Sequence, residues 1–259
     1  MSAPSILDDM IEDVVWLNNL VVRSSSLDGI LADSCAQLTI LTGFEDFPVS
    51  LPGSCTLVRY KTRCYLVCTR HQLKGIAESD YDKVCLAVSA FNGGTNFVTS
   101  AGAVWTDPKL YDTEYHEICA FDFTEQCAAY PELGRRFISI TEQHPDFQLG
   151  SVLWATAYGF PASRVNYDFE NRNIDVGRLR ISCRFGLKET DSAVHNLSIT
   201  DNMNMSPDGM SGGPTFFALA TGSVTRVHLA GIAVTGGMSN LRIIKAGAVL
   251  KMLMTAINQ

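Results

Sequence analysis

The sequence lacks an apolar run of the roughly 18 residues that a membrane-spanning helix needs. It also lacks an excess of basic residues, since 20 lysines and arginines stand against 27 aspartates and glutamates, for a net charge of −7. Nucleic-acid-binding proteins usually carry a basic face, so neither nucleic acid nor an anionic membrane is an expected partner. The first residues have neither the basic start nor the apolar stretch of a secretory signal, which predicts a cytoplasmic location.

Charged residues are few, at 18%, whereas 46% of the 259 residues are apolar. This composition suits a chain that buries a full core, either one large all-β domain or two small barrels packed together. Without a secretory signal, the eight cysteines are expected to be reduced, mostly buried thiols. They are Cys35, Cys55, Cys64, Cys68, Cys85, Cys119, Cys127 and Cys183.

Short β-rich runs separated by glycine, asparagine, proline and aspartate dominate the chain, which is typical of sandwiches and barrels. Apolar residues at helical spacing predict one helix over residues 5–22 and another over residues 240–258. We expect these helices to fold back on the body of the chain, or to dock a regulatory partner or a second copy. The predicted parts are an N-terminal helical segment (1–30), an N-terminal β-barrel (31–130), an inter-barrel linker (131–148) and a C-terminal β-barrel with its helix (149–259).

The strongest chemical signal is the segment from Gly209 to Pro214, which reads Gly-Met-Ser-Gly-Gly-Pro. A serine hydroxyl is a poor nucleophile at neutral pH, so it needs a base beside it and donors for the developing oxyanion. Glycines around Ser211 permit tight turns with inward-pointing amides, and the N–H groups of Gly209 and Ser211 are the predicted donors. The alternative is a glycine-rich turn with an incidental serine.

A candidate base lies upstream, where the apolar run Arg63–Thr69 leads into a polar turn that contains His71. A single histidine is more often structural than catalytic, but its place at a strand end, upstream of the serine segment, favours a general base. Cys64 and Cys68 precede this histidine at a spacing that can bind zinc. No fourth ligand is suitably placed, so neither a metal nor another cofactor is predicted.

The strand that ends beside His71, the segment Gly53–Val58 before it and the segment Gly209–Pro214 together resemble the trypsin-like (chymotrypsin-fold) serine peptidases. The resemblance covers about residues 30–245 and is closest to intracellular bacterial trypsin-like peptidases and HtrA-type protease domains. It implies an all-β fold of two antiparallel six-stranded β-barrels, here with N-terminal and C-terminal helices. It also implies a catalytic triad in the chain order histidine, acid, serine in the cleft between the barrels.

In this family the acid opens a strand of alternating apolar residues, and the matching stretch here begins at Glu117. The resemblance therefore implies that Glu117 accepts the imidazole N–H, holds its tautomer and stabilises the imidazolium. The family normally has an aspartate at this place. Asp112 is the main alternative acid and Asp122 the second.

A further departure from the family is Met210. Zymogen-activated members have an aspartate immediately before the serine, which pairs with a freed N-terminus. This chain has neither that aspartate nor a recognisable processing site, so activation by N-terminal cleavage is not expected. We hypothesise that substrate or a partner orders the oxyanion loop instead, as the HtrA-type resemblance implies.

The resemblance also implies where a substrate binds. Val234, Thr235 and Gly236 match the strand that pairs with an extended peptide and walls the primary pocket. Met205, six residues before Ser211, matches the pocket floor, and an apolar residue there predicts a medium-sized apolar side chain before the cleaved bond, not lysine or arginine. In the alternative interpretation, this strand and Met205 are simply core.

The sequence thus predicts a cytoplasmic serine endopeptidase that forms an acyl-enzyme on Ser211, with His71 as general base and Glu117 as the acid. Its expected partner is a protein or peptide substrate. Two alternatives stay open. One is a protease fold that binds peptides but has lost turnover, and the other is an esterase or other acyl hydrolase that uses the same site.

Overall fold

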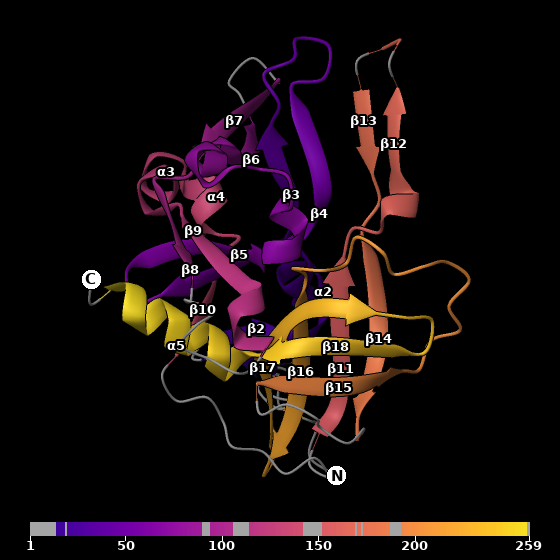
Figure 1. Ribbon diagram of the computed structural model, residues 1–259. Helices are drawn as coiled ribbons and strands as arrows, with labels where there is room; N and C mark the ends of the chain where they lie inside the picture. Colours follow the sequence, from indigo (N-terminus) through magenta and orange to yellow (C-terminus); the bar gives the residue numbers. More distant parts are fainter. Residues whose placement is uncertain are drawn as a thin grey trace.

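Two large β-sheets make up most of the computed structural model (Figure 1). Apart from one N-terminal hairpin, the first sheet comes from the first half of the chain and the second sheet from the second half. The structure describes residues 14–18, 20–89, 94–105, 114–141, 152–168, 170–171, 173–186 and 193–257.

The second sheet contains a closed barrel. Its strands are β11 (Val152–Gly159), β14 (Leu179–Phe185), β15 (Val194–Ile199), β16 (Pro214–Thr221), β17 (Val224–Gly236) and β18 (Asn240–Lys245). They follow the order β16–β11–β14–β15–β18–β17, and β16 also pairs with β17, which completes an antiparallel ring. Ile181, Leu197 and Phe217 are fully buried inside it.

The first sheet is curled. Its strands are β3 (Cys35–Leu41), β4 (Val49–Tyr60), β5 (Arg63–Thr69), β6 (Val84–Ser89), β7 (Thr95–Thr99), β8 (Gly102–Trp105), β9 (Ile118–Asp122) and β10 (Ile138–Ile140). They follow the order β7–β6–β3–β4–β5–β9–β8, and β10 pairs in parallel with β4. Leu57, Leu66 and Phe121 are fully buried on its concave side, within a second core cluster.

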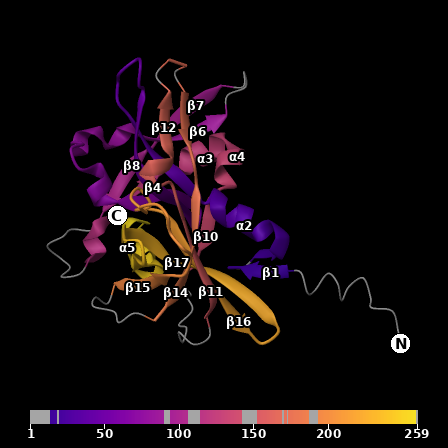
Figure 2. The same cartoon turned by 90° about the vertical axis from the view of Figure 1, so that its right-hand side faces the viewer.

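The closed barrel and the curled sheet together form a chymotrypsin-like two-barrel fold, which confirms the predicted all-β class. Only the C-terminal half is a closed six-stranded ring, because the outer strands β7 and β8 of the first sheet do not pair in the described part of the chain. A separate ribbon of β12 (Val165–Asp168) and β13 (Asn173–Val176) extends beside the first sheet (Figures 1 and 2).

The N-terminal segment departs from the prediction. Residues 14–23 form a hairpin of β1 (Val14–Leu17) and β2 (Leu20–Arg23), in which β1 also pairs in parallel with β17. Its β-branched residues favour a strand, and Asn18 takes a left-handed turn conformation with φ of 53°. The helix predicted over residues 5–22 is therefore wrong from residue 14 onward, and residues 5–13 lie outside the described residues.

The helices lie at the edges of the two sheets. The C-terminal helix is present as α5 and begins later than predicted, because residues 240–245 form the last barrel strand. It packs on β17 and β18 and also contacts β8, so it spans both sheets. No helix in the described ranges is both long and apolar enough to cross a membrane. The helices are α2 (Ser24–Asp33), α3 (Thr124–Ala129), α4 (Pro131–Gly134), α5 (Ala246–Ile257), and the short 3-10 helices η1 (Arg70–Leu73), η2 (Glu78–Lys83), η4 (Glu114–Glu117) and η6 (Ala162–Arg164).

The stretch predicted as an inter-barrel linker, residues 131–148, is more ordered at its start than expected. It begins with α4 and continues into β10, whose parallel pairing with β4 fastens it to the first sheet. Residues 142–148 lie outside the described residues.

Candidate active site

His71 lies where the chain leaves the first sheet, in η1 directly after β5. The backbone N–H and the hydroxyl of Thr69 both donate to the side-chain carbonyl of Gln72, at 2.9 and 2.8 Å. This reciprocal capping of a short helix turns the chain sharply at the strand end. It leaves the His71 side chain 32% exposed at the edge of a cavity between the two sheets.

Glu117 contacts the His71 ring. It ends η4 just before β9, and β9 pairs with β5 so that Ile118 is opposite Thr69. This pairing brings the Glu117 Oε1 atom to 2.5 Å from His71 Nδ1, and the backbone N–H of His71 donates to the same oxygen at 3.2 Å. The carboxylate therefore holds the proton on Nδ1. Nε2 then carries the lone pair that can accept a proton, and it lies 3.4 Å from the Thr69 hydroxyl.

The electrostatics of Glu117 agree with an ionised acid. Partial burial alone raises the pKa of its carboxyl group, but hydrogen bonds from the ring and the backbone of His71, together with the ring's charge, lower that pKa below its ordinary value. The two other candidate acids differ. Asp122 pairs with Arg63 at 3.6 Å instead of contacting His71, and Asp112 lies outside the described residues.

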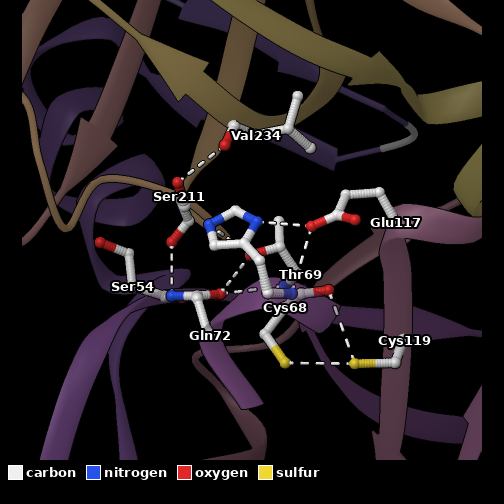
Figure 3. Close-up of polar contacts among 9 residues, drawn as sticks. Ser54, Cys68, Thr69, Gln72, Glu117, Cys119, Ser211 and Val234 are labelled. Carbon is white, nitrogen blue, oxygen red and sulfur yellow. Dashed lines mark hydrogen bonds and ion pairs between the residues drawn. The ribbon is translucent and has the colours of Figure 1, made fainter. Parts of the chain in front are cut away.

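Ser211 reaches the same cavity from the second sheet, on the loop before β16. Ser211 and His71 both line this cavity, whose volume is about 450 Å³. The Ser211 hydroxyl donates to the Val234 carbonyl at 2.8 Å, and within the described residues no hydrogen bond joins it to the His71 ring. Figure 3 shows the hydroxyl turned toward Val234. His71 and Ser211 thus share one cavity, with the hydroxyl rotated away from the ring, and Glu117 contacts the ring from an adjoining cavity.

Two backbone amides beside Ser211 are available as donors. Gly209 has φ of +92°, a conformation that favours glycine, and the Asp208 carbonyl before it accepts the Ala162 N–H at 2.7 Å. Because the peptide unit is planar and trans, the Gly209 N–H points to the opposite side. In the described chain neither this N–H nor that of Ser211 has a hydrogen-bond partner, so both can stabilise an oxyanion.

The serine loop is braced against the first sheet by side chains that the sequence reasoning missed (Figure 3). Gln72 Nε2 donates to the carbonyls of Ser54 and Ser211 at 3.0 and 2.8 Å, while its Oε1 accepts from Thr69. The Ser54 hydroxyl donates to the Gly209 carbonyl at 2.8 Å, and the Thr56 hydroxyl to the Gly212 carbonyl at 2.7 Å. The Thr69-x-x-Gln72 spacing, which is a helix-capping pattern, was the available sequence signal for Gln72.

Met210, the residue before Ser211, has a closely packed side chain and a hydrogen-bonded backbone. Its side chain is buried in the C-terminal barrel, and a Cβ atom on Gly159 would lie only 2.8 Å from Met210 Cγ. The backbone N–H of Met210 donates to Pro207 and its carbonyl accepts from Gly213, both at 3.0 Å. Close packing and turn hydrogen bonds therefore hold the loop around Met210 in this structure.

Val234, Thr235 and Gly236 line the cavity. β16 pairs with β17 only as far as Ile232, whereas β18 pairs with the other edge of β17 up to Gly236. The last residues of β17 therefore offer one edge with no strand partner in the described part of the chain. Such an edge can pair with an extended peptide.

Met205 is not where the sequence reasoning expected it. It does not line this cavity, and its sulfur lies 4.0 Å from the Ser163 hydroxyl. Pro207 and Leu241 line the cavity instead, and both approach the Cβ position of Gly236, at 3.4 and 3.1 Å. The position of Met205 was predicted from its sequence distance to Ser211, and that distance does not reflect the path of the loop before Pro207.

The cysteines are thiols. All eight are free, and all but Cys127 are buried. Burial raises the pKa of the Cys35 and Cys85 thiols to about 12. Cys68 lies against Cys119 with 3.4 Å between the sulfurs. In the described ranges no group of three or more histidine, cysteine or acidic residues could hold a metal.

No family model matches this chain, and no curated protein matches it either. Among solved structures, it is similar to the crystal structure of the scabies mite inactivated protease paralogue S-I1. The two chains are 9% identical, with a TM-score of 0.49, over 88% of this chain and 96% of the other. The function of this chain is therefore inferred from its own side chains.

Proposed function

We propose that this protein is a serine hydrolase that transfers acyl groups through Ser211. The observation that carries the proposal is the 2.5 Å contact between Glu117 and Nδ1 of His71, whose ring lines the same cavity as Ser211. In the described chain, two backbone amides beside Ser211 have no hydrogen-bond partner. Base, acid, nucleophile and oxyanion donors are the complete set that acyl transfer needs.

More particularly, we propose a serine endopeptidase of the trypsin-like kind. The free edge of β17 from Val234 to Gly236 supports a peptide substrate, because it offers backbone groups to an extended chain. Pro207 and Leu241 support a medium-sized apolar side chain before the cleaved bond. An ester substrate without a peptide backbone would contact Ser211, His71 and the oxyanion donors but would not pair with the edge of β17.

The reaction begins with rotation of the Ser211 hydroxyl. A substrate backbone N–H that donates to the Val234 carbonyl displaces the hydroxyl, which then donates to His71 Nε2. His71 takes the proton as Ser211 Oγ attacks the peptide carbonyl, and Glu117 stabilises the imidazolium. The amides of Gly209 and Ser211 hold the oxyanion. The imidazolium protonates the leaving amine, and water, deprotonated by His71, then cleaves the acyl-enzyme.

The test is labelling with a fluorophosphonate probe followed by digestion of a protein mixture. We expect wild type to be labelled and Ser211→Ala to stay unlabelled, with mass spectrometry finding cleavage after apolar residues. Labelling without any peptide cleavage would favour an esterase. Absence of labelling from a folded wild-type protein would overturn the proposal.

A second candidate function is a peptide-binding module without turnover. The observation that favours it is the Ser211 hydroxyl, which donates to Val234 and not to His71. In that case extended peptides would bind the β17 edge equally well in wild type and in Ser211→Ala, with no probe labelling in either.

We also propose a reducing compartment, such as the cytoplasm, as the location. All eight cysteines are thiols, including the adjacent pair Cys68 and Cys119, and disulfides are typical of oxidising compartments.

A further inference from the structure

A second cavity adjoins the proposed active site on the other side of His71. Its volume is about 390 Å³, and it shares His71, Val234 and Thr235 with the first cavity. Arg70, Lys74 and Arg242 also line it, and we call it the basic cavity for these three residues. It is therefore continuous with the place where a peptide would be cleaved.

The basic cavity contrasts with the charge of the whole chain, which is −7. Among the described residues that line the basic cavity, Glu117 has the only carboxylate, and that carboxylate is hydrogen-bonded to His71. Arg70 and Lys74 flank His71 on and just after η1, and neither has an ion-pair partner within the described ranges. Arg70 and Lys74, for which the described residues offer no ion-pair partner, thus line a space next to the proposed catalytic centre.

The path of an extended peptide leads into this cavity. A peptide that pairs in antiparallel fashion with the free edge of β17 has its cleaved bond at Ser211, beside Val234. Its residues before that bond then run along the edge toward Gly236. Thr235 lies between these two positions and lines both cavities. Because side chains alternate along an extended chain, every second side chain upstream of the cleaved bond can reach the basic cavity.

We propose that the basic cavity selects substrates with an acidic side chain two to four residues before the cleaved bond, which Arg70 and Lys74 bind. The selection rests on the proposed endopeptidase function and adds a second specificity element to the apolar pocket beside Ser211. Partly exposed ion pairs contribute modestly, so a glutamate in place of a glutamine should improve kcat/KM on the order of 5- to 20-fold at low salt.

The experiment uses peptide pairs that share one apolar residue before the cleaved bond and differ only by Glu or Gln at the second, third or fourth upstream position. We expect a Glu-over-Gln preference in kcat/KM at one of these positions, and its loss at about 0.5 M salt, where screening lengths fall below ~5 Å. Equal kcat/KM for both members of every pair would overturn the proposal and leave the endopeptidase function intact.

Charge variants locate the effect. The double variant Arg70→Gln, Lys74→Gln should bring the Glu/Gln ratio close to one. The matched control is Arg23→Gln, Arg184→Gln, which removes the same charge from two exposed residues outside both cavities and should keep the wild-type ratio. If the control changes the ratio as much as the double variant, the overall field of the protein and not this cavity sets the preference, and the proposal is wrong.

Binding to Ser211→Ala separates this inference from the proposed function, because it needs no turnover. By fluorescence anisotropy, the Glu peptide should bind the Ser211→Ala protein several-fold more tightly than the Gln peptide, in a salt-sensitive manner. If wild type hydrolyses no peptide but this difference is found, the endopeptidase proposal fails and the acidic selectivity stands. Equal binding of both peptides would overturn the proposed acidic selectivity, whether or not wild type cleaves peptides.

Discussion

Glu117 contacts His71 from the end of η4, directly before β9. The same oxygen accepts both the ring N–H and the backbone N–H of His71. One carboxylate oxygen thus orients the imidazole and fastens the turn that carries it.

The lowered pKa of Glu117 predicts a pH dependence of stability. An unfolded glutamate titrates near pH ~4.3, so the native state binds fewer protons than the unfolded chain around that pH. The carboxylate therefore stabilises the fold above pH ~4.3, and this contribution is lost as the pH falls through the lower, folded pKa. In urea denaturation between about pH 5 and pH 3, wild type should lose more unfolding free energy than Glu117→Gln.

Glu117→Gln is the matched control for wild type, because glutamine keeps the size of the side chain but has no carboxyl group that titrates. Parallel stability curves for the two proteins over that pH range would mean that Glu117 does not have a depressed pKa in the folded state.

At the scale of elements, the serine loop depends on glycines at defined places. Gly212 has φ of +86°, and a Cβ atom there would lie 2.0 Å from the Ser54 carbonyl oxygen. Gly247, in α5, has open space around its Cβ position. The same substitution at these two glycines should therefore have opposite effects.

We expect Gly212→Ala to lower the unfolding free energy by more than about 3 kcal/mol, because it combines backbone strain with a clash that only a backbone shift can relieve. Gly247→Ala should raise it by about 0.5 to 1 kcal/mol, because alanine is the better helix former. Thermal or chemical denaturation measures both. A Gly212→Ala protein as stable as wild type would contradict the packing of this loop against β4.

The elements themselves were predictable to different degrees. The run Arg63–Thr69 agrees with the structure, because the apolar residues and the polar turn after them mark the strand locally. Residues 14–22 carry apolar residues that also match a helical spacing, and pairing of β1 with the distant strand β17 decides for a strand. The periodicity of a short segment contains no information about a partner strand that lies about two hundred residues away in the sequence.

At the scale of the whole molecule, Gln72 links the first sheet to the Ser211 loop at the proposed active site. Its amide makes two donor and two acceptor contacts, which join the end of β5, the strand β4 and the serine loop. Such a fully satisfied buried amide has one orientation, so it sets the distance between the half that carries His71 and the half that carries Ser211.

Removing the Gln72 amide should lower the unfolding free energy, because it removes hydrogen bonds between the first sheet and the Ser211 loop. Gln72→Leu leaves backbone groups of Thr69, Ser54 and Ser211 short of partners and should cost about 2 to 4 kcal/mol of unfolding free energy. Gln37→Leu is the matched control. It removes one hydrogen bond, to Gly53, and also a buried oxygen without a partner, so its cost should stay below about 1 kcal/mol. Equal losses for both variants would contradict a special role for Gln72.

The sequence by itself predicted an all-β fold, because strand alternation and turn residues are local patterns. Its resemblance to the trypsin-like peptidases implied two barrels, with His71 and Ser211 in the cleft between them. Only the tertiary structure decided that Glu117 touches His71, that the Ser211 hydroxyl turns to Val234, and that Pro207 and Leu241 replace Met205 in the pocket. Those outcomes depend on strand register and loop packing between residues far apart in the chain. No local pattern encodes such distances.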